Sequence, residues 1–207
     1  MSQLKIAIVD YQAGNLRSVA KAIEKAGQRP IITSDPNAIA SADALVFPGQ
    51  GACDSAMRAL NQRGLTQPIK AFIATGRPFL GVCLGLQLLF SYSEEGLEPG
   101  LGTFPGRVRR LPDGLKIPHM GWNQVRFTQE HQVFKDVPNG SYFYFVHSYY
   151  PDPEEASLVA CTTTYGIQFC CAIARDNLVA TQFHPEKSGT LGLKIYDNFI
   201  KFAISRS

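Results

Sequence analysis

The chain has 207 residues, of which 45% are hydrophobic and 11% aromatic, and its formal net charge is +3 at pH 7. This length suits one domain with a substantial core, and the charge is too small to indicate a nucleic-acid-binding surface. The longest apolar stretch, residues 79–90, is interrupted by Gln87 and is shorter than the roughly 20 residues of a membrane span. We therefore expect one domain over residues 1–207 that binds neither nucleic acid nor membranes.

The first residues and the cysteines indicate the cellular compartment. Residues 1–5 lead directly into a strand-like run, without the apolar segment of a signal peptide. The cysteines are odd in number and irregularly spaced, which argues against a disulfide framework. We expect a cytoplasmic protein with reduced thiols at Cys53, Cys83, Cys161, Cys170 and Cys171. Since neighbours in a strand point to opposite faces, we expect one of the adjacent Cys170 and Cys171 in the core and the other less buried.

Strands and helices alternate in the first half of the chain. Ile6–Val9 is a buried strand candidate, and a helix follows whose apolar residues have helical spacing and which Gly27 ends; these residues are Leu16, Val19, Ala20 and Ile23. Short apolar strands with helix-like connections follow at residues 31–33, 44–47 and 79–82. This alternation predicts a parallel sheet that is covered on both faces.

The second half is rich in β-type runs separated by turn residues. They cover residues 107–111, 124–127, 142–146, 158–163, 167–173 and 178–182. Ile195, Phe199 and Phe202 then mark one face of a closing helix. We expect an α/β fold with a mostly parallel central sheet, helices on both faces and a β-rich second half.

Residues 78–87 contain a cysteine between two glycines where an apolar strand turns into a helix. Gly81-x-Cys83-x-Gly85 has the layout of the strand-turn-helix elbow that presents a nucleophile, because small neighbours permit unusual backbone angles. The helix N-terminus also favours a thiolate. The alternative is a buried structural cysteine.

A base for this nucleophile is expected near the end of the chain. His184 and Glu186 are two residues apart at the end of an extended segment, which places them on one side, and Pro185 restricts the backbone between them. Glu186 can then hold one imidazole nitrogen while the other faces Cys83. The alternatives are a solvated strand end and a metal site. We expect no metal, since the chain has no paired Cys-x-x-Cys or His-x-x-x-His spacing.

A glycine-rich loop, Gly49-Gln50-Gly51, follows another apolar run. The backbone N–H near Gln50 and that of Leu84 would form an oxyanion hole for a tetrahedral intermediate. The alternative is a phosphate or dinucleotide loop. It is disfavoured because the third glycine of a dinucleotide loop is missing and no Lys-Ser or Lys-Thr pair follows.

Together these segments resemble the class I glutamine amidotransferases, which hydrolyse glutamine through a cysteinyl thioester. Residues 10–16, 116–123 and 144–150 narrow the resemblance to the glutaminase subunits of imidazole glycerol phosphate synthase, which act in histidine biosynthesis. The resemblance runs along nearly the whole chain. It implies the class I glutamine amidotransferase fold and no cofactor.

The resemblance also implies roles for single residues. Cys83 would attack the glutamine amide, His184 would protonate the departing ammonia and later activate water, and Glu186 would orient His184. Backbone and side-chain groups would surround the bound glutamine at Gly49, Gly51, Gln87, Ser148 and Tyr149.

A partner is implied as well. In the family, ammonia passes to a (β/α)8-barrel cyclase subunit that makes imidazole glycerol phosphate and AICAR, and the two subunits form a heterodimer. Residues at the partner interface would be Asn15, Pro118, His119, Met120 and Trp122. A single tryptophan in a β segment is nevertheless more often part of the core.

Two positions depart from the family pattern, and other functions stay open. Gln12 stands where glycine is common and Gln50 where a small aliphatic residue is common, so Gln50 would affect the control of the oxyanion loop rather than the chemistry. The alternatives are the glutaminase subunit of another amidotransferase, a stand-alone thiol hydrolase of related fold, and a non-catalytic interaction subunit. The last would be expected to have lost Cys83, His184 or Glu186.

Overall fold

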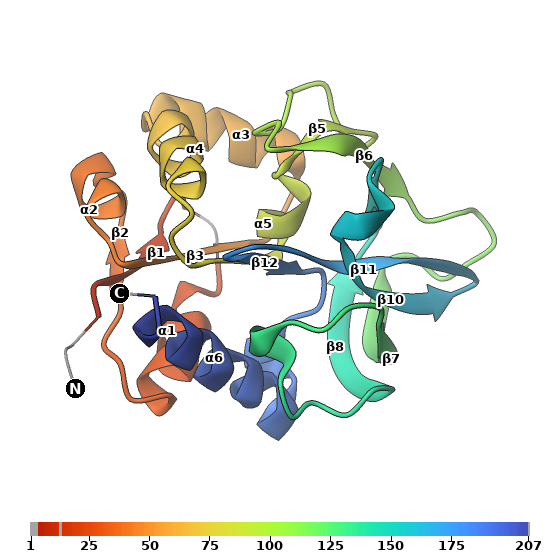
Figure 1. The fold of residues 1–207 in the computed structure, drawn as a ribbon. Coiled ribbons are helices and arrows are strands. Elements are labelled where there is room, and N and C mark those ends of the chain that lie inside the picture. Colours follow the sequence, from red (N-terminus) through yellow and green to blue (C-terminus); the bar gives the residue numbers. More distant parts are fainter. Residues whose placement is uncertain (1–3, 13, 207) are drawn as a thin grey trace.

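The computed structural model describes residues 4–12 and 14–206. A central sheet divides these residues into two layers (Figure 1). One half of the sheet is parallel. Its strands are, in spatial order, β2 (Ile31–Thr33), β1 (Ile6–Val9), β3 (Ala44–Gly49), β4 (Phe79–Cys83) and β12 (Leu178–Thr181).

The other half of the sheet is antiparallel. The strands continue outward from β12 as β11 (Ile167–Arg175), β10 (Val159–Tyr165), β7 (His119–Phe127) and β8 (Ser141–His147). The prediction of a parallel sheet is therefore correct for the first half of the chain, and the β-rich second half extends the same sheet in antiparallel fashion. Short turns connect β10 to β11 and β11 to β12, and such turns can join only antiparallel neighbours.

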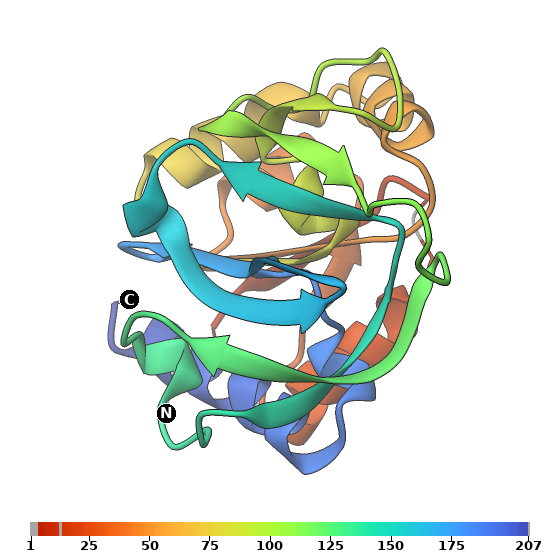
Figure 2. The ribbon, with the colours of Figure 1, turned by 90° about the vertical axis from the view of Figure 1, so that its right-hand side faces the viewer.

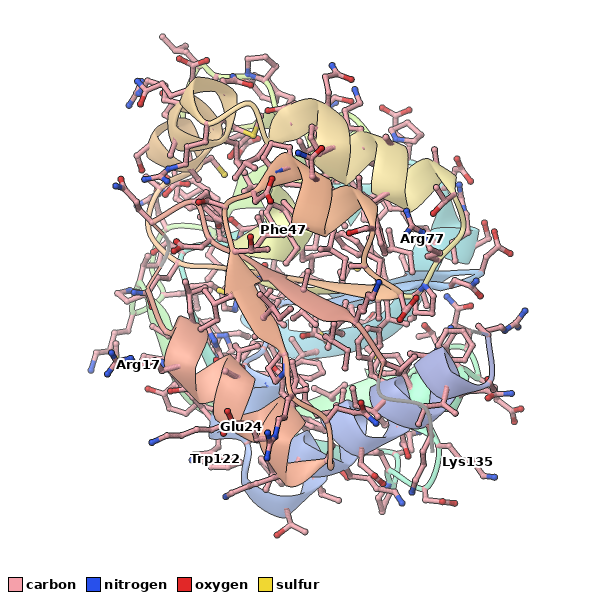
Figure 3. The ribbon with its side chains drawn as sticks, turned by 90° about the vertical axis from the view of Figure 1, so that its left-hand side faces the viewer. Arg17, Glu24, Phe47, Arg77, Trp122 and Lys135 are labelled. Atoms are coloured by element: carbon pink, nitrogen blue, oxygen red, sulfur yellow. The ribbon has the colours of Figure 1, made fainter. Side chains whose placement is uncertain are left out.

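Each face of the sheet packs on its own core. In β3, Ala44 and Val46 pack with α1 (Leu16–Lys25) and α6 (Gly189–Ile204), whereas Leu45 and Phe47 pack on the opposite side. That side carries the remaining helices (Figure 1), and Figure 3 shows Phe47 beneath them. These helices are α2 (Pro36–Ala40), α3 (Cys53–Gln62), α4 (Thr66–Ala74) and α5 (Leu84–Gln87).

A smaller sheet lies above the antiparallel half (Figure 2) and consists of β5 (Phe90–Ser93), β6 (Phe104–Arg110) and β9 (Tyr149–Pro153). The sequence predicted only the β6 strand. Residues 149–153 contain two prolines, which is why their sequence does not suggest a strand; proline is tolerated here because β9 is an edge strand. Short 3₁₀ turns occur at η1 (Gln132–Phe134), η2 (Ala156–Leu158) and η3 (Pro185–Lys187).

The cysteines are all unpaired and buried. Cys170 and Cys171 point to opposite faces of β11 and belong to different cores. The expectation that one of them is less buried was wrong, because this part of the sheet is covered on both sides. Across residues 4–12 and 14–206, the helices are too short or too polar to cross a membrane.

Candidate active site

Two glycines near Cys83 allow the elements around it to pack closely. Cys83 ends β4 and caps α5 with φ 55° and ψ −110°, a positive-φ conformation that costs energy in a residue other than glycine. A Cβ at Gly85 would lie 1.8 Å from the Phe47 carbonyl oxygen, and one at Gly81 would lie 2.7 Å from the Ala180 Cβ. Gly85 therefore lets α5 pack closely on β3, and Gly81 lets β12 pack closely on β4, the strand that ends at Cys83.

His184 and Glu186 leave the sheet beside this elbow. The parallel register of β12 with β4 pairs Thr181 with Val82, so the residues that follow these strands lie at the same edge. His184 Nδ1 is 2.8 Å from Glu186 Oε1, and both side chains are almost completely buried. The contact forms in the turn η3 rather than along an extended segment. The His184 N–H donates to the Tyr144 carbonyl, which fixes the turn to β8.

The charge on His184 is set by its neighbours. Burial lowers the pKa of the imidazole, but the Cys83 thiolate and the Glu186 carboxylate raise it, and the net result is a pKa of about 10. Because Nδ1 is engaged with Glu186, the buried Nε2 is the nitrogen left available to Cys83. The arrangement is a buried cysteine beside an imidazole, with a carboxylate behind the ring.

The β1–α1 loop supports Glu186 from a distant part of the sequence. Asn15 Nδ2 donates to Glu186 Oε1 over 2.6 Å. The hydroxyl of Tyr196, on α6, also lies close: burial and the Glu186 carboxylate raise the pKa of this tyrosine. Asn15 was expected at a partner interface, which stays a prediction, and its side chain binds the carboxylate that holds His184. No periodicity in the sequence signals this contact.

The same loop supports β3, the strand that leads into the glycine-rich loop at Gln50 and Gly51. The Tyr11 hydroxyl donates to the Pro48 carbonyl over 3.1 Å, and Gly49 pairs with Cys83 in the β3–β4 register. Gln12, one of the departures from the family pattern, has φ 72°, where glycine is favoured. Gln50, the other, covers Gly14 so closely that a Cβ there would lie 1.7 Å from its Nε2.

These groups surround a cavity of about 340 Å³. Most residues predicted for the site line it, whereas Gly49 lies just before it in β3 and Glu186 stands behind His184. Glu95 was missed by the sequence analysis, because a glutamate after β5 carries no pattern of its own. The lining consists of Gln50, Gly51, Cys83, Leu84, Gln87, Glu95, Pro118, Val146, His147, Ser148, Tyr149, His184 and Lys187.

An exposed apolar surface borders the cavity. Met120 and Trp122 on β7 are 62% and 56% exposed, and Tyr142 on β8 is 54% exposed. Pro118, at the start of this segment, is exposed and lines the cavity, and Val146 of the cavity wall pairs with Met120. We call these five residues the β7–β8 face.

His119 does not belong to this face. It was expected at the partner interface, but alternation along β7 turns it to the opposite side, where it is only 4% exposed. Its ring stacks on Tyr165 at 4.1 Å between centroids and its Nδ1 is 3.0 Å from His147 Nε2. Burial lowers its pKa to about 4. The expectation of a partner contact was wrong for this side chain.

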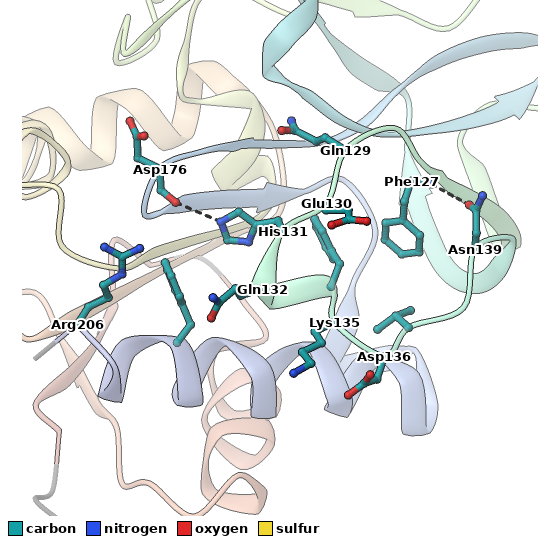
Figure 4. A pocket seen from close by; sticks show the side chains of 13 residues that line it. Phe127, Gln129, Glu130, His131, Gln132, Lys135, Asp136, Asn139, Asp176 and Arg206 are labelled. Atoms are coloured by element: carbon teal, nitrogen blue, oxygen red, sulfur yellow. Dashed lines mark hydrogen bonds between the residues drawn. The ribbon is translucent and has the colours of Figure 1, made fainter.

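A larger hollow of about 780 Å³ lies at the amino end of β12, away from Cys83 (Figure 4). His131 in it is held on both ring nitrogens, by the Val133 N–H and the Asp176 carbonyl. Its described lining contains no cysteine or serine. Over the described ranges there is also no group of three His, Cys, Asp or Glu side chains that could hold a metal ion.

The model of the family described as glutamine amidotransferase class-I matches residues 7–202. The chain belongs to the class-I glutamine amidotransferase family. A curated family member from Microcystis aeruginosa, named imidazole glycerol phosphate synthase subunit HisH, is 54% identical over 95% of this chain and 94% of its own length. A protein of the same name from Geobacter metallireducens is 51% identical, over 94% of this chain and 96% of its own length.

Solved structures with low sequence identity share the amidotransferase fold. A putative GMP synthase component from Thermoplasma acidophilum has a TM-score of 0.75 at 20% identity, and covers 100% of this chain and 96% of its own. The glutaminase domain of CTPS from Trypanosoma brucei, solved with acivicin, has a TM-score of 0.71 at 18% identity, and covers 98% and 94%. These likenesses establish the fold of the central sheet and its helices.

The charge pair predicts how His184 titrates. Because its folded pKa is raised above the ordinary 6.5, protonation of His184 stabilises the fold; this contribution is complete below pH 6.5 and is lost as the pH rises through about 10. Replacing Cys83 by alanine removes the largest raising influence, so the imidazole should lose its proton at lower pH. The measurement is the pKa of the His184 ring by NMR titration, in the native chain and in Cys83→Ala. The His131 ring serves as an internal control in both. Equal titration of His184 in the two proteins would contradict the ion pair.

Proposed function

We propose that this chain is the glutaminase subunit of an imidazole glycerol phosphate synthase and hydrolyses glutamine to glutamate and ammonia. The observation that carries the proposal is the buried Cys83, His184 and Glu186 arrangement at the wall of the cavity. The names of the relatives that are more than 50% identical support the same function. Residues 1–207 would form one glutaminase domain.

The first half of the reaction forms a thioester. The Cys83 thiolate attacks the side-chain carbonyl of glutamine, and the backbone N–H groups of Leu84 and Gln50 would stabilise the resulting oxyanion. The imidazolium of His184 then gives its Nε2 proton to the departing nitrogen as the C–N bond breaks, and ammonia leaves. The raised pKa of His184 supports its role as the acid, because the ring is already protonated when substrate binds.

The second half releases glutamate. Neutral His184 takes a proton from water, whose oxygen attacks the thioester carbonyl, and the C–S bond breaks to return Cys83 to the thiolate. Glu186 holds Nδ1 throughout and stabilises the imidazolium each time it forms, and Asn15 keeps that carboxylate in place.

Glutamine brings an ammonium and a carboxylate into the cavity besides its reactive amide. Glu95 is the acidic side chain in the described lining, so we assign it to the substrate ammonium. Lys187, also in the lining, is the basic one. The peptides at Gly49, Gly51, Ser148 and Tyr149, together with Gln87, would complete the site. This proposal uses no metal or cofactor.

The β7–β8 face fits a protein partner next to the site. It is an apolar surface with an aromatic centre, which is typical of protein interfaces, and its Pro118 and Val146 form part of the cavity wall. We propose that the (β/α)8-barrel cyclase subunit binds here as a heterodimer and receives the ammonia. A stand-alone hydrolase of related fold would have no use for this exposed face.

Removing the nucleophile tests the reaction. We expect Cys83→Ala to lower glutaminase turnover by at least about 1,000-fold, because the attacking atom is lost. The measurement is ammonia release in the presence of the partner, with Cys53→Ala as the control, since burial raises the pKa of that thiol to about 12. A glutamine-like electrophile should modify Cys83 in the native protein. Labelling of another cysteine would show that the nucleophile is misassigned.

A second substitution tests the substrate ammonium site. Glu95→Gln removes the negative charge while keeping the size, and we expect KM for glutamine to rise roughly 10- to 100-fold, since a hydrogen bond to a charged group is worth about 1.5–3 kcal/mol. Turnover at saturation should change little. Glu94→Gln is the matched control, because Glu94 is exposed and lies outside the cavity lining. An unchanged KM in Glu95→Gln would exclude the assignment.

The partner surface is tested through activation. We expect the chain alone to hydrolyse glutamine slowly and the cyclase subunit with its acceptor ligand to raise the rate strongly. Trp122→Ala should increase the partner concentration needed for half-maximal activation by roughly 30-fold, the effect of losing an interface anchor worth about 2 kcal/mol. Tyr92→Ala, which removes an equally exposed aromatic ring on β5, is the control. Full activity without the partner, or equal behaviour of the two variants, would argue against this interface.

A further inference from the structure

Gln182 contacts the proposed nucleophile from inside the protein. It follows β12 directly, two residues before His184, and its side chain is fully buried. Its Nε2 is 3.6 Å from Cys83 Sγ, and its Oε1 is 2.9 Å from Gln87 Nε2. The sequence analysis gave Gln182 no role other than the end of a predicted strand.

The effect of Gln182 on the sulfur depends on which end of its amide faces Cys83. The NH₂ group donates and the oxygen accepts, and a carboxamide can be placed either way round. The surroundings settle the choice. The Tyr149 carbonyl can only accept, so the group of Gln87 that lies 2.9 Å from it is the NH₂. The same NH₂ faces Gln182, which must therefore present its oxygen to Gln87 and its own NH₂ to Cys83.

The Tyr149 carbonyl, at which this series of hydrogen bonds ends, is also contacted by His147. His147 Nδ1 lies 2.8 Å from the Tyr149 oxygen and must donate to it, so His147 Nε2 accepts from His119 Nδ1 over 3.0 Å. Burial lowers the pKa of His147 to about 3 and keeps the ring neutral. The Tyr149 oxygen thus has a donor for each of its lone pairs, which fixes the orientation of Gln87 and Gln182.

We propose that Gln182 is a catalytic residue that donates a hydrogen bond to the Cys83 sulfur and stabilises it as a thiolate. The inference rests on the proposed function, in which Cys83 is the nucleophile. A donor favours the charged form of its partner, because a hydrogen bond to a charged group is stronger than one to a neutral group. The thiol form has its own acceptor, the Val146 carbonyl at 3.9 Å, so the two forms of Cys83 use different neighbours.

The hydrogen bond from Gln182 matters at the stages of the reaction in which the Cys83 sulfur is negatively charged. Negative charge leaves the sulfur as the thioester forms and returns to it when the C–S bond breaks. Gln182 therefore stabilises the thiolate both as the resting nucleophile and as the leaving group of the second step. It does so without a charge of its own, whereas His184 must give up its proton during the reaction.

The titratable groups around Cys83 come from several elements. They are His184 and Lys187 after β12, Tyr11 after β1, His147 at the end of β8 and Glu95 after β5. Gln182→Met changes none of these and keeps the side chain nearly the same size. A changed thiol titration in this variant therefore reports the lost amide donor.

The test is the rate at which iodoacetamide alkylates Cys83, measured against pH by mass spectrometry of the full-length chain. We expect the midpoint of the pH profile to rise by about 1 pH unit in Gln182→Met, which is the shift produced by about 1.4 kcal/mol of lost stabilisation. Gln182→Glu, which places a carboxylate beside the sulfur, should raise it further. Gln168→Met is the control, because Gln168 is an exposed glutamine on the neighbouring strand β11.

The outcomes separate this inference from the proposed function. If Cys83 of the native chain is not the alkylated cysteine, the proposed nucleophile is wrong. If Cys83 reacts but Gln182→Met keeps the native midpoint while circular dichroism shows it folded, the role of Gln182 is wrong and the proposed function stands.

A second measurement tests the hydrogen bond without any substitution of Gln182, in case the Gln182 variants fail to fold. The side-chain amide protons of Gln182 in the native chain are observed by ¹⁵N NMR and compared with those in Cys83→Ala. A hydrogen bond to sulfur predicts an upfield shift of one amide proton when the sulfur is removed. Unchanged positions of both protons would overturn the inference.

Discussion

The parallel pairing of β4 with β12 is the constraint on which the site depends. It places the ends of two strands from distant parts of the chain at one edge of the sheet, so that Cys83 and His184 meet. The pairing of β3 with β4 adds Gly49 to the same edge. Gly81 makes the close packing of β4 on β12 possible, because any side chain there would collide with Ala180.

This pairing buries His184 and Glu186 beside Cys83, and hydrogen bonds from neighbouring groups support part of the arrangement. Burial of charged groups is favourable only where partners take up their remaining donors and acceptors, and Glu186 Oε2 and His184 Nε2 are buried without one among the described residues. On the imidazolium side Glu186 accepts from His184 and is itself held by Asn15. On the sulfur side the amide of Gln182 lies within hydrogen-bonding distance. Cys83 and His184 line the cavity, whereas Glu186, Asn15 and Gln182 are not among its described lining residues.

Contacts made by β7 and β8 connect the site to the β7–β8 face. β8 holds the His184 backbone through Tyr144, whose ring contacts Trp122 with 6.3 Å between centroids. The two hydrogen-bonded chains that meet at the Tyr149 carbonyl begin at His119 on β7 and at Cys83 on β4. The strands that carry the β7–β8 face thus also hold His184 and one wall of the cavity.

The sequence by itself determined the local features: the order of most strands and helices, the elbow at Cys83, and the candidate residues His184 and Glu186. Each is encoded by neighbouring residues, through apolar periodicity, glycine spacing or a short motif. Tertiary structure decided the rest, because contacts between distant segments leave no local pattern. The inward turn of His119, the binding of Asn15 to the Glu186 carboxylate, Glu95 in the cavity and the direction of the Gln182 amide all depend on such contacts.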